Sequence, residues 1–190
     1  MEQTYINDKV FEKEECKPYL KKDTEFENCT FKSCDLSNSD LSNIKFINCG
    51  FQNCNLSMVK WENTALREVN FRDCKMLGCR FDRCNAFGLA FSFSNCALDH
   101  SSFFRTKVKK TIFKNSKLQD CDFTESDLSA SVFESCDLNG AVFEHTVLEK
   151  ADLRSAYNYA IDPEMNRIKG TRFSSQGLSG LLLKYNIDIE

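Results

Sequence analysis

The sequence has few of the residues on which most catalytic and loop-rich proteins depend. Its 190 residues include only 2 Pro, 7 Gly, 2 His and 1 Trp. So little Gly and Pro argues against a loop-rich β-sandwich or a disordered linker protein, and two histidines leave little material for metal or acid–base chemistry. No run approaches the roughly 18–20 apolar residues of a membrane span, and the acidic N-terminus does not resemble a secretory signal. We therefore expect a cytoplasmic protein with reduced thiols.

What the sequence does contain is a repeat five residues long. Leu or Phe occupies 21 of the 24 positions reached by stepping in fives from Phe26 to Phe81 and from Leu98 to Leu153. Two residues before each of these central positions lies a second file, which apart from Ile44 holds only Ala, Cys, Ser, Thr or Val. Neither the 3.6-residue helical period nor the two-residue strand period produces a sustained spacing of five. The pattern is therefore a five-residue unit, [small]-x-[Leu/Phe]-x-x, which recurs twelve times in each of the two tracts.

With this repeat, the chain resembles the pentapeptide-repeat family. The segments CDLSNSDLSN (34–43) and CDFTESDLSASVFESCDLNGAVF (121–143) match the family consensus A(D/N)Lxx. The resemblance implies an all-β fold, a right-handed, four-sided parallel β-helix solenoid with one pentapeptide per side. In such a fold both files face the core. Residues 20 apart would then stack at the strand spacing of roughly 4.8 Å. We expect an N-terminal cap over 1–23, the β-helix over 24–156, and a C-terminal cap over 157–190, with a short helix at 177–185 and a short strand at 186–190.

The repeat changes phase once, which indicates two inserted residues near 85–95. The tracts before and after this break lie on different remainders modulo five. Two interpretations remain open. In the first, Phe87, Phe91 and Phe93 simply pack a wider coil. In the second, a bulge presents apolar side chains, Phe87 and Leu89 above all, to a partner.

Eleven cysteines suggest metal or redox chemistry, but their positions favour packing. Ten of them, all but Cys16, fall in the small inward file, where they stack or point into different walls rather than converge as zinc ligands do. No nucleophile–histidine–acid spacing, phosphate loop or metalloprotease motif occurs. We therefore expect no enzyme, no cofactor and no metal. Cys16 is the one thiol expected to react readily, whereas a redox sensor would need several.

Charge is the most informative surface property, because the β-helix forces charged side chains outward. Residues 118–153 carry nine acids against Lys150, a net charge of −8, whereas residues 98–117 carry a net charge of +5. The nine acids are Asp120, Asp122, Glu125, Asp127, Glu134, Asp137, Glu144, Glu149 and Asp152.

Four of the nine directly precede a central residue, namely Asp122, Asp127, Asp137 and Asp152. We expect them to recur along the walls at coil spacing. Such rows of carboxylates resemble the charge density of a DNA backbone and would attract a basic DNA-binding cleft. The alternative is that an outward face is polar in any case and that Asp belongs to the family consensus.

Three segments resemble a narrower group within the family, the bacterial proteins that protect DNA gyrase and topoisomerase IV. They are VNFRDCKMLGCRF (69–81), FSFSNCALDHSSFF (91–104) and ADLRSAYNYAIDPEMNRIKGTRFS (151–174). The group includes quinolone-resistance proteins and the self-immunity proteins against albicidin and microcin B17. The resemblance implies a DNA-mimicking surface that binds the topoisomerase, with no direct contact to nucleic acid or membrane.

The same resemblance implies a homodimer that forms through the C-terminal elements. We expect its contacts at the apolar face of the C-terminal helix, which consists of Leu178, Leu181, Leu182 and Tyr185. The alternative function is a structural or protein-interaction scaffold with no topoisomerase partner.

Overall fold

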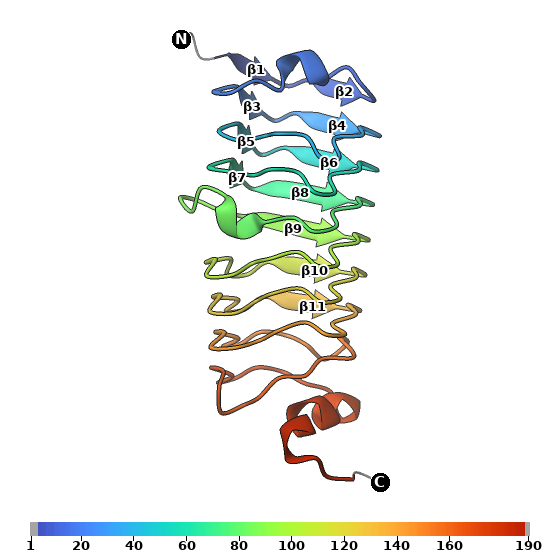
Figure 1. Ribbon diagram of the computed structural model, residues 1–190, viewed down its shortest axis with the longest axis vertical. Coiled ribbons are helices and arrows are strands. Elements are labelled where there is room, and N and C mark those ends of the chain that lie inside the picture. Colours follow the sequence, from blue (N-terminus) through green and yellow to red (C-terminus); the bar gives the residue numbers. More distant parts are fainter. Residues whose placement is uncertain (1–3, 189–190) are drawn as a thin grey trace.

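The computed structural model describes residues 4–188, which form a narrow rod of stacked coils (Figure 1). Its short strands pair in parallel with the strands of the coils above and below. The strands are β1 (Tyr5–Asn7), β2 (Val10–Glu12), β3 (Glu25–Glu27), β4 (Thr30–Lys32), β5 (Lys45–Ile47), β6 (Gly50–Gln52), β7 (Ala65–Arg67), β8 (Val69–Arg72), β9 (Phe91–Ser94), β10 (Ile112–Lys114) and β11 (Val132–Glu134). The 3₁₀ helices are η1 (Lys17–Tyr19), η2 (Phe81–Arg83), η3 (Ser175–Leu181) and η4 (Leu183–Tyr185). The expected parallel β-helix with a small C-terminal helical element is confirmed.

Each coil has four sides, which we name walls A to D in chain order. Wall A carries the sheet β1-β3-β5-β7, and wall B carries the seven-stranded sheet from β2 to β11. Walls C and D are joined between coils by isolated parallel bridges. In one complete coil the central residues of the four walls are Phe26, Phe31, Leu36 and Leu41, all fully buried.

The core consists of stacked central residues and a file of small hydrogen-bond donors. The rings of Phe31 and Phe51 lie one above the other with centroids 4.6 Å apart. In the small file, the Cys49 thiol donates to the Phe26 carbonyl oxygen (3.4 Å), and the Thr64 hydroxyl donates to the Leu41 carbonyl oxygen (2.7 Å). The small position thus favours Cys, Ser and Thr because these side chains both fit and satisfy a buried carbonyl group.

The inserted residues lie between Asn85 and Ala90, on wall A. The hydrogen bond from the Asn85 amide to the Thr64 carbonyl oxygen spans the same number of residues as the equivalent bonds in the other coils. The bond from the Val69 amide to the Ala90 carbonyl oxygen spans two residues more than its equivalents. From that point β8 and β9 pair in a register of 22 residues instead of 20. The sheet of wall A therefore ends at β7, while the sheet of wall B continues through β9 (Figure 1).

Phe91 explains why the chain leaves wall A at this coil. It occupies the inward position two residues before Phe93, which holds a small residue elsewhere, and its ring lies 5.1 Å from that of Phe93 and 5.3 Å from that of Phe81. Since this ring fills the core, residues 86–89 are displaced outward. The first interpretation of the break, a wider packed coil, holds for Phe91 and Phe93, which are buried. The second, a bulge that presents apolar side chains, holds for Phe87, which is 77% exposed.

The β-helix extends further at both ends than the repeat predicts. Strands β1 and β2, inside the predicted cap of residues 1–23, already pair with β3 and β4. At the other end, the bridges Val147↔Arg167 and Asp152↔Arg172 carry the ladder beyond residue 156. The weak repeat in both segments is therefore sufficient for strand pairing, since main-chain hydrogen bonds do not depend on the side chain.

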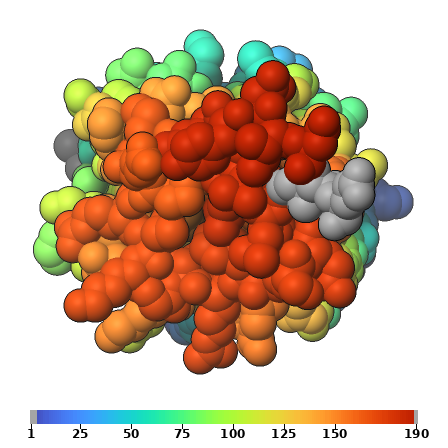
Figure 2. Space-filling model, turned by 90° about the horizontal axis from the view of Figure 1, so that it is seen from below, coloured from blue at the N-terminus to red at the C-terminus, as the bar shows by residue number. Residues whose placement is uncertain are grey.

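The C-terminal residues lie over part of the last coil (Figure 2). Ser174 caps η3 by accepting a hydrogen bond from the Gly177 amide (3.2 Å). The prediction of one helix over 177–185 is wrong in detail, because two 3₁₀ helices meet at Leu182. Residues 186–188 do not form the predicted strand, and Ile189 lies outside the described residues.

Gly177 and Gly180 let η3 approach the last coil closely. A Cβ atom at Gly177 would lie 2.0 Å from the Tyr159 hydroxyl, and one at Gly180 would lie 2.2 Å from the Tyr159 carbonyl oxygen. The contact is reinforced by Lys184, whose ammonium group lies 2.8 Å from Asp162 and 2.7 Å from Glu164.

Candidate partner-binding surfaces

The four aspartates that precede a central residue do not form a row along one wall. Asp127 lies in the ladder of wall A, Asp152 in that of wall B, Asp137 in that of wall C and Asp122 in that of wall D. The expectation that they recur along the walls at coil spacing is therefore wrong. A four-sided coil of 20 residues stacks only residues that share a remainder modulo 20, and these four do not.

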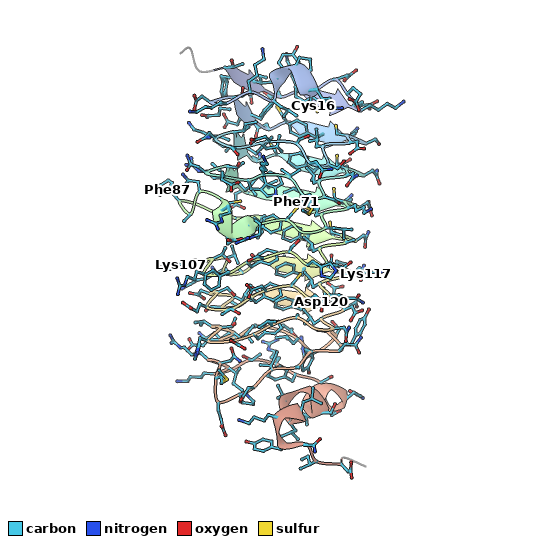
Figure 3. All side chains as sticks on the ribbon, viewed as in Figure 1. Cys16, Phe71, Phe87, Lys107, Lys117 and Asp120 are labelled. Atoms are coloured by element: carbon cyan, nitrogen blue, oxygen red, sulfur yellow. The ribbon has the colours of Figure 1, made fainter. Side chains whose placement is uncertain are left out.

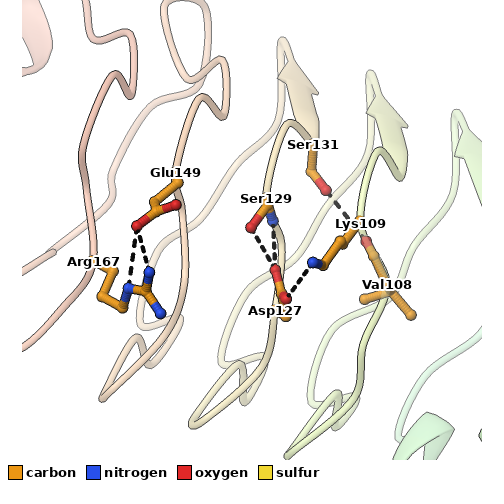
Figure 4. Close-up of polar contacts among 7 residues, drawn as sticks. All are labelled: Val108, Lys109, Asp127, Ser129, Ser131, Glu149 and Arg167. Atoms are coloured by element: carbon orange, nitrogen blue, oxygen red, sulfur yellow. Dashed lines mark hydrogen bonds and ion pairs between the residues drawn. The ribbon is translucent and has the colours of Figure 1, made fainter.

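Five of the nine predicted acids are paired with basic side chains. The pairs are Glu125–Arg105 (2.8 Å), Asp127–Lys109 (3.1 Å), Glu134–Lys114 (2.8 Å), Glu149–Arg167 (2.7 Å) and Asp152–Arg154 (2.7 Å). Three of these partners, Arg105, Lys109 and Lys114, belong to the basic segment 98–117, in the coil before that of their acids. Figure 4 shows one such pair, Lys109 with Asp127. The basic and acidic segments, adjacent in sequence, thus neutralise each other in part across the coil boundary.

These contacts alter the acidity of the paired carboxyl groups. The hydrogen bonds from Arg105 lower the pKa of Glu125. Burial acts to raise the pKa of Asp127, but hydrogen bonds from Ser129 and Lys109 outweigh it and the pKa is lowered. These carboxylates remain charged at neutral pH, yet their charge is matched by a neighbour rather than free for a partner.

Four acids have no lysine or arginine partner among residues 4–188, and three of these four lie together on wall D and its corner with wall C. They are Asp120, Asp122 and Glu144, in two consecutive coils. The Asp120 carboxylate has only His100 nearby, 3.6 Å away. We call these three residues the wall D acidic sector. The remaining predicted acid, Asp137, is on wall C and accepts hydrogen bonds from Gln119 and Asn158.

The loop at the break presents only one of its two predicted contact residues. Phe87 is 77% exposed, whereas Leu89 is half-buried and packs against the core. A cavity of about 410 Å³ lies at the base of the loop, lined by Phe81, Ala86, Phe87, Leu89, Arg105 and Lys107 among others. Figure 3 shows Phe87 and Lys107 on one side of the rod and Lys117 and Asp120 on the other.

The four predicted dimer contacts differ in how far their side chains are exposed to solvent. Leu178 and Tyr185 are exposed, whereas Leu181 and Leu182 are half-buried. The structure adds Leu183 and Ile187, which are 62% and 55% exposed. Sequence reasoning missed Leu183 because it assumed an α-helical period, and a 3₁₀ helix has three residues per turn.

The cysteines are packing residues, and the one expected to be reactive is buried. Cys16 is fully buried and its sulfur lies 3.8 Å from that of Cys34, so the prediction that it reacts readily is wrong. Cys84, which lines the loop cavity, is the only half-buried thiol, and burial raises its pKa. Within residues 4–188 no group of His, Cys, Asp and Glu side chains is arranged to hold a metal ion. The helices of this range are also too short to cross a bilayer.

The architecture defines the class: a parallel β-solenoid built from five-residue units, with an interruption on one wall. The profile of the pentapeptide repeat region matches residues 24–103, and that of eight pentapeptide repeats matches residues 126–157. Together they cover more than half of the chain, which belongs to the pentapeptide-repeat family. No curated protein sequence is similar enough to match it.

Solved structures share the fold over nearly the full length. Full-length QnrB1, a plasmid-mediated fluoroquinolone resistance protein, is 18% identical, with 97% of this chain and 98% of QnrB1 aligned at a TM-score of 0.54. A trypsin-treated QnrB1 variant is 19% identical, with 98% of each chain aligned at a TM-score of 0.50. At these identities the likeness establishes the fold.

Proposed function

We propose that this protein binds a type II topoisomerase, DNA gyrase or topoisomerase IV, as a DNA mimic and so protects it from a gyrase-targeting antibacterial. The likeness of its fold to a fluoroquinolone resistance protein along the whole rod supports this proposal. A topoisomerase partner would place the protein in the cytoplasm, where it would act as a binder and not as an enzyme.

The wall D acidic sector is the observation that carries the proposal. Asp120 and Asp122 lie in one coil and Glu144 lies in the next, and adjacent coils in such a stack are about 4.8 Å apart. Carboxylates without a lysine or arginine partner, gathered in this way on a rigid rod, would offer a basic cleft a local concentration of negative charge. The paired acids of the other walls would contribute little, because their partners already screen them.

The mimicry is tested by supercoiling of DNA by gyrase, with the purified protein titrated in the presence and absence of a quinolone or a peptide poison. We expect rescue of poisoned supercoiling, and inhibition of the unpoisoned enzyme at higher dose. The triple variant Asp120→Asn, Asp122→Asn, Glu144→Gln should lose this effect, most clearly at low salt.

A matched control removes the same number of charges from other positions: Glu134→Gln, Glu149→Gln and Asp152→Asn. This variant should retain protection, and equal loss in both variants would contradict a role specific to the sector. Absence of any effect on gyrase and topoisomerase IV would favour the second candidate, an interaction scaffold, which the pairing of five of the nine acids also favours.

A homodimer through the C-terminus is part of the same proposal. Four exposed apolar side chains at that end, Leu178, Leu183, Tyr185 and Ile187, support it. Burial of this surface against a second copy would double the length of the rod and would cover apolar area that is otherwise in water.

A further inference from the structure

The loop at the break surrounds a preformed cavity at the corner between walls D and A, in the coils before the wall D acidic sector. The cavity of about 410 Å³ is lined by the apolar residues Phe81, Ala86 and Phe87 and by the basic residues Arg105 and Lys107. Its volume falls in the range of roughly 300–1,000 Å³ typical of ligand pockets.

The loop is held in one conformation by contacts at its base and tip. The guanidinium carbon of Arg67 lies 5.1 Å from the centroid of the Phe87 ring. The Asn85 side chain accepts a hydrogen bond from the Phe87 amide (3.0 Å) and donates one to Asn63 (2.8 Å). Gly88 has a φ of +66°, which favours glycine at the turn. An aromatic ring that packing alone would bury is thus fixed in an exposed position.

The charge that this surface presents to a partner is positive. Lys107 and Lys110 are exposed and have no ion-pair partner among residues 4–188. The one carboxylate that lines the cavity, that of Asp82, is only 7% exposed and is bound by Arg80 at 2.7 Å. A partner therefore meets an exposed ring, a cavity lined by the unpaired Lys107, and a second unpaired cation, Lys110, three residues further along the chain.

We propose that this cavity binds an acidic peptide segment carrying one large apolar side chain. The apolar side chain enters beside Phe87, where it removes exposed ring surface from water, and the neighbouring carboxylates face Lys107 and Lys110. A nucleic acid strand fits less well, since along wall A its phosphates would meet Glu68 before the loop, then Asp127 and Glu149 after it. The basic surface is long enough only for a short anionic segment.

Fluorescence anisotropy with a labelled synthetic peptide tests this proposal. The probe is a peptide of Asp, Glu and Ser residues with a single central Phe, compared with the same peptide carrying Ser in place of Phe, and with oligo-dT of equal length. We expect the Phe peptide to bind most tightly, with an affinity that falls as salt rises. The Phe87→Ser variant and the double variant Lys107→Gln, Lys110→Gln should each weaken binding by about tenfold or more.

Two matched variants on wall C serve as controls. Tyr157→Ser removes another exposed aromatic ring, and the double variant Lys75→Gln, Lys117→Gln removes two other exposed charges. Both should bind the Phe peptide as the wild type does. Equal weakening by these controls, indifference to the central Phe, or absence of binding would overturn the proposal. Tighter binding of oligo-dT that is lost in the Lys107→Gln, Lys110→Gln variant would also overturn it, in favour of a nucleic acid site. None of these outcomes depends on topoisomerase binding.

Discussion

Arg67 covers one face of the Phe87 ring, with its guanidinium carbon 5.1 Å from the ring centroid. The two residues belong to consecutive levels of wall A, where β7 ends and the inserted loop begins. A cation over an exposed ring contributes about 0.5–1 kcal/mol, enough to bias the loop toward one conformation. The loop therefore has a preferred conformation on the surface of the rod.

The two phenylalanines of the break should respond very differently to truncation. Phe91 is buried among three rings, so Phe91→Ala should lower the free energy of unfolding by about 3–5 kcal/mol. Phe87→Ala should change it by less than about 0.5–1 kcal/mol, because only the contact with Arg67 is lost. Urea denaturation of both variants measures the difference, and similar losses would show that Phe87 is part of the core.

Thiol accessibility should separate Cys84 from the other ten cysteines. Ellman's reagent should modify Cys84 slowly in the native protein, because it is half-buried and its pKa is raised, and should modify all eleven in denaturant. Cys84→Ser should abolish the native reaction, whereas Cys16→Ser should leave it unchanged. Rapid native modification of several thiols would instead support a redox sensor.

The Asp127 carboxylate should contribute stability that depends on pH. It accepts hydrogen bonds from the Ser129 amide (3.1 Å) and hydroxyl (2.5 Å) and lies 3.1 Å from the Lys109 ammonium group (Figure 4). Although burial acts to raise its pKa, these contacts lower it, so the stabilisation is present above the unfolded-state pKa of about 3.9 and is lost as pH falls through the folded-state value.

Asp127→Asn should therefore lower the free energy of unfolding by about 1 kcal/mol at pH 7. The difference from the wild type should shrink as the pH falls below about 3.9, since the unfolded wild-type chain then gains a proton on this carboxyl more readily than the folded chain does. Urea denaturation across this pH range measures it. A difference that stays constant with pH would indicate that the loss comes from geometry and not from charge.

The C-terminal apolar surface should determine the oligomeric state. On the proposed dimer, the double variant Leu183→Asp, Ile187→Asp should be a monomer by light scattering, because two carboxylates would be buried unpaired in the interface. Met58→Asp, at an equally exposed apolar side chain far from that end, should remain dimeric. A wild-type protein that is monomeric at every concentration would refute the dimer.

The five-residue repeat by itself determined most of the fold. Leu or Phe at nearly every fifth position, with a mostly small residue two positions earlier, specifies which side chains are inside, and the phase change locates the insertion. Periodicity is a property of the sequence alone, and each coil packs only on its neighbours. The separation of the four aspartates onto different walls was also present in the sequence, in their remainders modulo 20.

Only the tertiary structure determines which surface charges have an ion-pair partner and which do not. Lys109 reaches Asp127 and Arg105 reaches Glu125 because stacking brings residues about one coil apart within a side chain's length. Likewise, Phe87 and Phe91 are indistinguishable as residue types, and only the space inside the coil determines which ring is buried and which is exposed. The Phe91 ring is the one that packs in the core, beside Phe81 and Phe93, and the loop that carries Phe87 lies outside the coil.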